Sequence, residues 1–316
     1  MIPVVDIRSA RGRRELTDAW GHVGFASVVG HDIDPDLVAE MRAVARRLFE
    51  LPDEQHRRDR ITPTNYRGHI PLGFFTPNRA EVNGVAPDRY EGWKLHWECP
   101  PEHPVAGECA LYGPNRWPDG LPELRIVVER YWAACDRAVE PMFDAIAVAL
   151  GIDADLLRSW HEAPLTNMTL LHYPPAPPGG DSSGIHPHKD TNVLTLLHPD
   201  PVGGLEVRSP AGAWIEVDAP ADALVVNVGE MLELWSGGRF RATPHCVVNR
   251  SGRERYSFPF FVVPHHAVVV EPLVEPLPGF SKPSMPVGAL SAEVWRTNWP
   301  GERATSSDHD LGALDR

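Results

Sequence analysis

The segment His188-Lys189-Asp190, with His245 further along the chain, is the most informative part of this sequence. On an extended backbone residues i and i+2 project to the same side, so His188 and Asp190 can hold one cation while Lys189 points away. Two imidazoles and one carboxylate occupy one face of an octahedron and leave three positions open. That arrangement is typical of non-haem Fe(II) sites that use oxygen. We therefore predict a metal centre formed by His188, Asp190 and His245.

A second pair with the same spacing, Arg255 and Ser257, lies downstream on an apolar stretch that runs to Phe261. A guanidinium among buried neighbours is costly unless an anion satisfies it, and its planar fork matches a carboxylate. Ser257 adds a hydroxyl donor on the same face. These residues predict a carboxylate-binding site, with an internal salt bridge from Arg255 to an acidic residue as the alternative.

Composition narrows the class of partner. The chain has 316 residues and a net charge of −13, from 30 basic and 43 acidic residues. It has no run of lysine or arginine that could follow a phosphate backbone, and no long apolar segment, so we expect neither nucleic acid nor membrane as a partner. A small-molecule substrate is the remaining expectation, and the oligomeric state is not indicated.

The cysteines and the N-terminal residues bear on the compartment. The four cysteines are scattered without a CxxC pair, and the chain opens on Ile2-Pro3-Val4-Val5-Asp6 rather than on a charged segment followed by an apolar one. We therefore expect a cytoplasmic protein without a disulfide framework or a structural zinc site.

Helical spacing of apolar residues predicts two helices. Asp34-Pro35 has the form of a helix start, and the stripe behind it ends before Leu51-Pro52. A longer stripe over 122–150 predicts a support helix, kinked at Pro141 and closed by Gly151. Residues 53–120 are rich in Pro, Gly and Arg, and we interpret them as loops and short elements over a core.

Beyond residue 165 short β-branched and aromatic runs alternate with turn residues, which indicates a barrel or jelly roll. The predicted fold is mainly β with flanking α-helices. We expect a helical or mixed region over 1–160 packed on a core at 161–280, with a tail or lid at 281–316, in one compact unit. The predicted strands are Met168–Tyr173, Val193–Leu197, Leu205–Val207, Trp214–Val217, Ala223–Val228, Cys246–Asn249 and Tyr256–Val263.

Taken together, these motifs resemble the isopenicillin N synthase-like family of Fe(II)/2-oxoglutarate-dependent dioxygenases. The resemblance extends over nearly the whole chain to about residue 264. Besides the two pairs above and His245, it rests on Ile2 to Asp6, Gly24-Phe25, His31, Leu51-Pro52, Asn115 to Pro118, Leu171 to Pro175, Leu194 to Leu197, Gly203 to Leu205, Val226 to Gly229, Trp235-Ser236 and Arg255 to Phe261.

The resemblance implies a double-stranded β-helix core with iron held by the predicted triad. It also implies that 2-oxoglutarate chelates the metal and that its far carboxylate pairs with Arg255 and Ser257, with a further hydrogen bond from Tyr173. Leu171 and His172 stand where many plant members carry asparagine and tyrosine, so the resemblance carries over no contact for these two residues.

The implied reaction is the oxidation of an unactivated C–H bond of a small molecule by O2, with release of succinate and CO2. Hydroxylation is the expected outcome, and desaturation or ring closure are others. Which product forms depends on how the protein aims one C–H bond at the metal. His186 and Phe261 are the residues that we expect beside the substrate.

Two other functions compete with this interpretation. One is an iron oxidase like isopenicillin N synthase, which works without 2-oxoglutarate. The other is a jelly-roll binding protein that has no catalytic activity, although the intact triad argues against it. A cupin-type site at His186 and His188 is not favoured, because no glutamate follows at short spacing, and His198, His265 and His266 are expected at the surface or in loops.

Overall fold

The fold is built on two facing β-sheets covered on one side by helices. The computed structural model describes residues 2–75, 87–176 and 183–297. Within them the larger sheet has the strand order β1-β2-β10-β7-β13-β5-β4-β3, with β12 also paired to β5, and the smaller sheet has the order β6-β11-β8-β9. The strands are β1 Val4–Asp6, β2 Phe25–Val29, β3 Gly68–Ile70, β4 Glu91–His96, β5 Asn167–Tyr173, β6 Ser183–His188, β7 Leu194–Leu197, β8 Leu205–Arg208, β9 Trp214–Glu216, β10 Leu224–Val228, β11 His245–Val248, β12 Arg255–Ser257, β13 Phe260–Val262, β14 Val269–Val270 and β15 Met285–Pro286.

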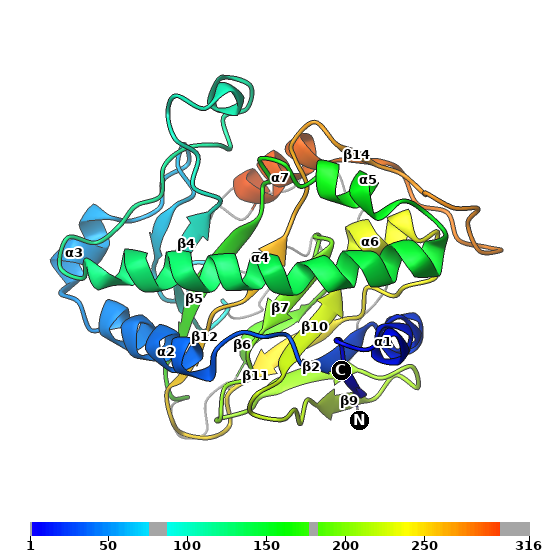
Figure 1. The fold of residues 1–316 in the computed structure, drawn as a ribbon. Helices are drawn as coiled ribbons and strands as arrows, with labels where there is room; N and C mark the ends of the chain where they lie inside the picture. The colour runs from blue at the N-terminus through cyan, green and yellow to red at the C-terminus, as the bar shows by residue number, and fades with distance from the viewer. Residues whose placement is uncertain (1, 76–86, 177–182, 298–316) are drawn as a thin grey trace.

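The helices cover the outer face of the larger sheet. In Figure 1 the long helix α4 lies across this sheet, with α2 alongside it and α1 near its far end. Asp34 caps α2 through the backbone N–H of Asp36, and α4 runs through Pro141 without a break until Gly151, which adopts φ 68°. The helices are α1 Ala10–His22, α2 Pro35–Phe49, α3 Asp53–Arg58, α4 Glu123–Leu150, α5 Ala154–Ser159, α6 Glu230–Trp235 and α7 Val287–Thr297, with a 3-10 turn, η1, at Pro104–Gly107.

Strand β5 shows how the two sides of the larger sheet differ. Met168 and Leu170 belong to the large apolar cluster that includes the buried face of α4. Leu171 and Tyr173 point the other way, into a smaller cluster that includes residues of both sheets. Successive residues of a strand face opposite sides, so one strand serves both the helical layer and the interior between the sheets.

The predicted jelly-roll core is confirmed, and several of its details differ from expectation. The predicted strand Tyr256–Val263 is two strands, β12 and β13, separated around Pro259, which has no N–H to donate to a ladder. The region 53–120, predicted as loops and short elements, contributes β3 and β4 to the larger sheet. The N-terminal strands β1 and β2 also join that sheet, so residues before 160 form part of its framework.

The C-terminal region predicted as a tail or lid contains helix α7. Its Trp295 packs 5.0 Å from the His96 ring and 5.3 Å from the Tyr66 ring, measured between centroids. Residues 298–316 of the predicted tail lie outside the described residues.

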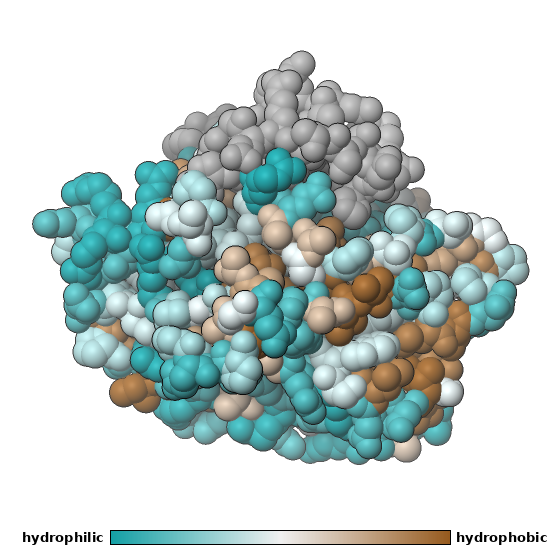
Figure 2. All heavy atoms as spheres, turned by 90° about the horizontal axis from the view of Figure 1, so that it is seen from above, coloured by the Kyte–Doolittle hydropathy of each residue, from teal (hydrophilic) through white to brown (hydrophobic). Residues whose placement is uncertain are grey.

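The exposed apolar residues of the outer surface are spread over several helices, strands and loops. In Figure 2 hydrophilic residues cover much of the face seen from above, and hydrophobic ones gather toward its right side. Among the described residues, no helix is both long and apolar enough to cross a membrane. The exposed large hydrophobic residues come from several helices, strands and loops: Val4, Leu72, Ile126, Val148, Leu156, Val269 and Leu277.

A partly buried carboxylate links three neighbouring strands on the helix-facing side. Glu91 of β4 accepts a hydrogen bond from His172 Nδ1 of β5 at 2.7 Å and one from His69 Nε2 of β3 at 3.3 Å. The ring of His56 stacks on His69 with 4.3 Å between centroids. Burial alone would raise the pKa of Glu91, but the hydrogen bonds from His172 and His69 outweigh it and lower the pKa to about 2.

We predict that Glu91→Gln lowers the free energy of unfolding by about 1–3 kcal/mol, because an amide cannot accept both imidazole hydrogen bonds as an anion does. A carboxyl whose pKa is depressed in the folded state stabilises the fold above its unfolded-state pKa of about 4.5, and this contribution is lost as the pH falls toward about 2. Urea denaturation at several pH values should show the gap between the two proteins narrowing below about pH 4.5.

Glu140→Gln is the matched control for this substitution. Glu140 pairs with Arg158 at 2.7 Å, but its side chain is 52% exposed, so the loss should stay below about 1 kcal/mol. Equal losses for the two variants would contradict the structural role of Glu91.

Candidate active site

Three metal-binding side chains meet where β6 and β11 lie side by side. His188 ends β6, His245 begins β11, and the two residues are directly paired across these strands. Asp190 follows two residues after the end of β6 and turns back, so that Oδ1 lies 3.6 Å from His188 Nε2 and Oδ2 lies 3.7 Å from His245 Nε2. The two histidines are thus neighbours within one sheet rather than partners across the barrel, and all three ligand atoms lie within 4.8 Å of one another.

The backbone sets the tautomer of both imidazoles. His188 Nδ1 donates to the carbonyl of His186 at 2.9 Å, and His245 Nδ1 donates to the carbonyl of Thr243 at 3.1 Å. Because each Nδ1 carries the proton, each Nε2 presents a lone pair toward Asp190. Burial, with His188 nearby, lowers the pKa of His245 to about 4, which keeps this ring neutral at physiological pH.

The carboxylate of Asp190 is held by polar side chains from the larger sheet. Oδ2 accepts hydrogen bonds from Thr195 Oγ1 at 2.6 Å and from Asn227 Nδ2 at 2.7 Å. Burial raises the pKa of Asp190, but His245, His188 and these two hydrogen bonds outweigh it, so the net shift is downward and the group is an anion. Both hydrogen bonds fall on Oδ2, which leaves Oδ1 for a cation.

The segment that carries Asp190 is fixed by the start of α6. The backbone N–H of Glu230 donates to the Asp190 carbonyl at 2.8 Å, and that of Met231 donates to the Asn192 carbonyl at 3.1 Å. Gly229 lies against the same segment, where a Cβ atom would be 2.1 Å from the Asn192 carbonyl oxygen. A glycine is therefore required at this position if the Asp190 loop is to keep its place.

The donor set and its exposure fit a ferrous ion with open coordination positions. Two neutral imidazoles and one carboxylate form one side of a coordination sphere. The His188 side chain is 35% exposed, whereas those of Asp190 and His245 are 8% and 9% exposed, so the centre opens on the His188 side. Phe25 of β2 covers His245 edge-on, with 5.3 Å between ring centroids.

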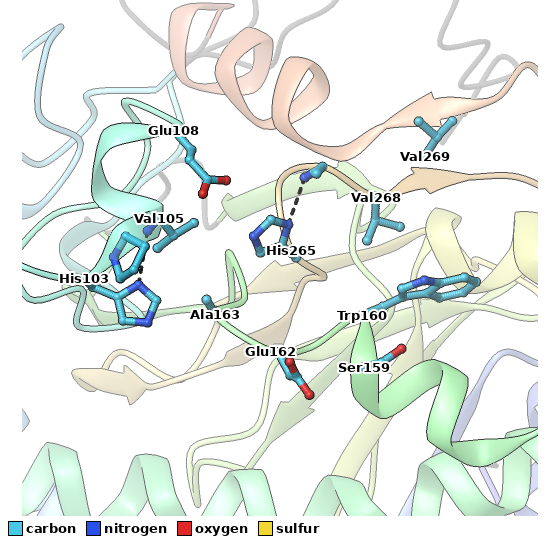
Figure 3. Close-up of a pocket in the computed structure, with 12 residues that line it drawn as sticks. His103, Val105, Glu108, Ser159, Trp160, Glu162, Ala163, His265, Val268 and Val269 are labelled. Carbon is cyan, nitrogen blue, oxygen red and sulfur yellow. Dashed lines mark hydrogen bonds between the residues drawn. The ribbon is translucent and has the colours of Figure 1, made fainter.

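Two further clusters of metal-binding residue types occur among the described residues, and their hydrogen bonds set them apart. In one cluster His69 Nε2 donates its proton to Glu91, as described above, and His56 Nε2 donates to the Leu48 carbonyl at 2.9 Å. Neither Nε2 therefore offers a lone pair to a metal. The other, formed by Glu108, His265 and His266, borders a pocket of about 660 Å³ shown in Figure 3.

In that pocket His265 Nδ1 accepts a hydrogen bond from the Ala267 N–H at 3.1 Å, so Nε2 of the neutral ring carries the proton. The pocket lies between η1, the end of α5 and the segment after β13, and its lining includes Glu108 and Trp160 (Figure 3). Of these three clusters, the one with His188 and His245 differs from the others in one respect. There, backbone carbonyls hold both Nδ1 atoms, so that two Nε2 lone pairs point toward a buried carboxylate.

Arg255 is buried without a carboxylate partner. Its side chain is in the core at 2% exposure, its Nε donates to the Gly203 carbonyl at 2.8 Å, and its guanidinium lies 4.7 Å from the centre of the Tyr173 ring. Among the described residues no ion pair involves Arg255, and its Nη1 has no hydrogen-bond partner. The internal salt bridge considered as an alternative is therefore not found there, and an anionic ligand would supply the missing acceptor.

Register brings the other predicted cosubstrate residues to the same place. In the antiparallel pair of β12 and β5, Arg255 lies opposite Tyr173 and Ser257 lies opposite Leu171. Burial raises the pKa of Tyr173 to about 12, so its hydroxyl remains a neutral donor. His172 points to the helix-facing side and binds Glu91, which explains why no cosubstrate contact carries over to it.

The two residues expected beside the substrate lie near the centre in different ways. His186 is partly buried next to His188 on β6, and Asp88 binds its Nδ1 at 2.6 Å. Phe261 of β13 lies opposite Thr195 of β7. His198, which was expected at the surface or in a loop, follows the end of β7 and is buried there, hydrogen-bonded to Tyr131 at 2.8 Å.

Sequence reasoning missed the residues that support the centre from a distance. Asn227 and Lys94 were not predicted as site residues, because their contacts with Asp190 and Asn167 span 37 and 73 positions. Thr195 was missed although it lies only five positions from Asp190, since a threonine in an apolar strand is not a distinctive pattern. The alternation in Trp93-Lys94-Leu95-His96 was the available signal for β4, since every second residue there is apolar.

This fold and this centre together define a non-haem iron oxygenase, and comparison with known proteins identifies its family. Residues 165–264 match the 2OG-Fe(II) oxygenase superfamily, and residues 2–120 match the family described as non-haem dioxygenase in morphine synthesis N-terminal. A 2-oxoglutarate-Fe(II) type oxidoreductase of Aspergillus fumigatus is 32% identical over 75% of this chain and 72% of its own length. Homoarginine-6-hydroxylase of Glycine max is 29% identical over 82% of this chain and 80% of its own.

Solved structures agree with the sequence relatives. A full-length Neurospora crassa protein, solved in complex with alpha-KG, superimposes with a TM-score of 0.77 at 25% identity, over 93% of this chain and 95% of that one. The dioxygenase for auxin oxidation of rice gives a TM-score of 0.73 at 28% identity, over 96% and 97%. The chain belongs to the Fe(II)/2-oxoglutarate-dependent oxygenases, and its cofactors are Fe(II), 2-oxoglutarate and O2. Neither the iron oxidase independent of 2-oxoglutarate nor the non-catalytic binding protein is favoured.

We predict that Gly229→Ala weakens Fe(II) binding about 10- to 100-fold, the usual effect of disturbing residues that orient metal ligands. The added methyl group would displace the Asn192 carbonyl and with it the loop that carries Asp190. Competition with a coloured chelator measures the affinity. Gly107→Ala is the control, because a Cβ at Gly107 meets nothing within 4 Å. Unchanged iron affinity in the Gly229 variant would show that this close approach does not position the carboxylate.

Proposed function

We propose that His188, Asp190 and His245 hold the catalytic Fe(II) of an oxygenase that hydroxylates an unactivated C–H bond of a small molecule. The observation that carries this proposal is the meeting of three ligand atoms within 4.8 Å, with both imidazoles presenting Nε2. Asp190 supplies the anionic ligand, and Thr195 and Asn227 keep it oriented.

The proposal assigns the far carboxylate of 2-oxoglutarate to Arg255, Ser257 and Tyr173. The buried guanidinium with an unused Nη1 donor supports this assignment, because a carboxylate accepts two parallel N–H bonds from an arginine fork. Ser257 follows on the same strand at i+2, and Tyr173 lies against the guanidinium. The carbonyl of Gly203 holds Nε and so orients the fork.

When bound, iron with 2-oxoglutarate and O2 supplies the oxidising power, and succinate and CO2 are the coproducts. The chain's own residues bind the metal and the cosubstrate, orient the substrate and exclude water. The carbonyl partners of His188 and His245 hold Nδ1–H, so both rings direct Nε2 to the metal position, and Asp190 is the anionic member of the ligand set. The closed side formed by Phe25 and the open side at His188 direct a substrate toward one face of the centre.

The substrate of the proposed reaction is a small molecule that lies beside His186 and Phe261. The net charge of −13 and the absence of a basic run argue against a nucleic acid. Related structures hold small molecules, among them thymine in the Neurospora protein. None of the four cysteines forms a disulfide, which supports a reducing compartment such as the cytoplasm.

We predict that Asp190→Ala abolishes iron retention, since it removes the anionic ligand from the set. Metal analysis of anaerobically reconstituted protein measures the loss, and circular dichroism checks that the fold is kept. His265→Ala is the matched control, because this residue belongs to the cluster around Glu108 instead, and its iron content should equal that of the wild type. Iron that follows His265 rather than Asp190 would refute the proposed centre.

We predict that Arg255→Ala keeps iron but weakens 2-oxoglutarate binding about 10- to 100-fold, in line with about 1.5–3 kcal/mol for a hydrogen bond to a charged group. The measurement is an anaerobic titration of the weak visible charge-transfer band that 2-oxoglutarate gives with the Fe(II) protein. Arg42→Ala is the control, because Arg42 pairs with Asp200 and is only part-buried. An unaltered cosubstrate affinity in the Arg255 variant would remove this residue from its role.

A further inference from the structure

Among the described residues, the hydrogen bonds of Lys94 go only to neutral oxygens. Lys94 lies on β4 opposite Thr169 of β5, and its Nζ donates to Asn167 Oδ1 at 2.6 Å and to Thr169 Oγ1 at 3.1 Å. The ammonium also lies 5.2 Å from the centre of the Phe261 ring. Among the described residues no carboxylate forms an ion pair with it. An ammonium has three donors, so one N–H, and a charge that no carboxylate in the described part of the chain pairs with, are left for a ligand.

Register connects Lys94 to the proposed metal centre. Directly opposed residues in antiparallel strands project to the same face. Asn167 lies opposite Phe261, Phe261 lies opposite Thr195, and Thr195 is hydrogen-bonded to Asp190. The ammonium is held above β5, two strands away from β7, so with about 4.8 Å between strands it is roughly 10 Å from Thr195 along this face. Lys94 and Asp190 therefore border one common face of the larger sheet.

The pKa of Lys94 reflects its burial and its nearness to Asp190. Burial lowers the pKa of Lys94 to about 7, and the negative charge of Asp190 acts in the opposite direction. A buried ammonium without a counter-ion is costly, and an anion placed beside it would stabilise the charged form. The side chain nevertheless keeps part of its surface accessible, so a ligand can reach it.

Around His96, Arg67 adds positive charge and Trp295 adds a flat apolar wall. Burial, with Arg67 and Lys94 nearby, holds the pKa of His96 well below its usual value, so its ring is neutral. His96, two residues along β4, and Arg67 are buried at 5% and 3% exposure, and among the described residues His96 Nε2 and Arg67 Nε have no hydrogen-bond partner. Trp295 of α7 lies 5.0 Å from the His96 ring and 5.8 Å from the Arg67 guanidinium. The Glu98 carboxylate accepts a 2.6 Å hydrogen bond from Asn115. Burial lowers the pKa of Arg67 and the charge of Glu98 raises it, so this carboxylate partly offsets that cation. Lys94 has no carboxylate partner among the described residues, so this corner favours a ligand with an anionic group on an apolar body.

Resting on the proposed function, we infer that Lys94 binds a carboxylate of the substrate, so that the chain oxidises small carboxylic acids. The carboxylate takes the free N–H of the ammonium, and the apolar body lies along Phe261 toward the iron. The separation along the sheet places the oxidised carbon several bonds from the acid group. The far carboxylate of 2-oxoglutarate stays with Arg255, which pairs with Tyr173, four residues along β5 from the Thr169 that lies opposite Lys94.

Calorimetry on metal-free protein tests this inference without any turnover. The probes are phenylacetate, 3-phenylpropionate and indole-3-acetate, each compared with its primary amide, which has the same shape and no charge. We expect wild-type protein to bind at least one acid about tenfold or more tightly than its amide, a preference of the size expected for a charge-assisted hydrogen bond. Absence of binding by all three acids at millimolar concentration, or equal affinity for acid and amide, overturns the inference.

Three variants test whether Lys94 is the source of the preference for an acid over its amide. Lys94→Met should abolish it, Lys94→Arg should retain it, and Arg255→Ala should leave it intact because the cosubstrate site is separate. Thermal unfolding checks that each variant is folded. The comparison of acid with amide on the wild-type protein remains a valid test even if one variant does not fold. A preference that survives Lys94→Met and disappears in Arg255→Ala would place the acid in the cosubstrate site and overturn the inference.

The iron-dependent measurements separate this inference from the function on which it rests. Lys94→Met should give the same 2-oxoglutarate titration of the visible band as wild type. If the band forms normally and no acid binds, the substrate class is wrong while the oxygenase assignment stands. If acids bind through Lys94 but the band never forms, the assignment of the metal and cosubstrate residues is wrong instead.

Discussion

The hydrogen bonds that Thr195 and Asn227 donate to one oxygen of Asp190 are the constraint on which the rest of the centre depends. Asp190 lies beyond the end of β6, where no ladder holds its backbone, and a carboxylate in a loop is free to rotate. The two donors come from β7 and β10, neighbours in the larger sheet. They join that sheet to the smaller one, which carries both imidazoles. The geometry of the centre is thus a property of how two sheets face each other.

This arrangement also explains why polar groups occupy so much of a buried face. Thr195, Asn167, Thr169 and Lys94 point to the interior between the sheets, whereas the helix-facing side of the same sheet is largely apolar apart from the cluster around Glu91. Each of the four has a hydrogen-bond partner, which offsets part of the cost of burying it. These interior polar residues and the apolar residues that face the helices alternate along the same strands.

The local patterns could be predicted from sequence, whereas the long-range support could not. The pairs His188/Asp190 and Arg255/Ser257 lie within two residues, and the stripes of α2 and α4 repeat over several turns, so each pattern carries its own signal. Strand β4 follows a Pro- and Gly-rich region and carries a lysine on its interior face, so its alternation resembles loop sequence. The support from Asn227 to Asp190 spans 37 positions, and its partner is identifiable only from the pairing of strands.

The place of β2 has a consequence for how the chain acquires its native state. β2 belongs to the N-terminal region, yet it pairs with β10, and its Phe25 covers the imidazole of His245. During synthesis the segment emerges long before either partner exists, so it waits in a non-native setting until the later strands appear. Such distant pairing slows folding and leaves apolar edges open to aggregation meanwhile. The β2–β10 pairing and the cover that Phe25 gives to His245 therefore form only after the later strands have left the ribosome.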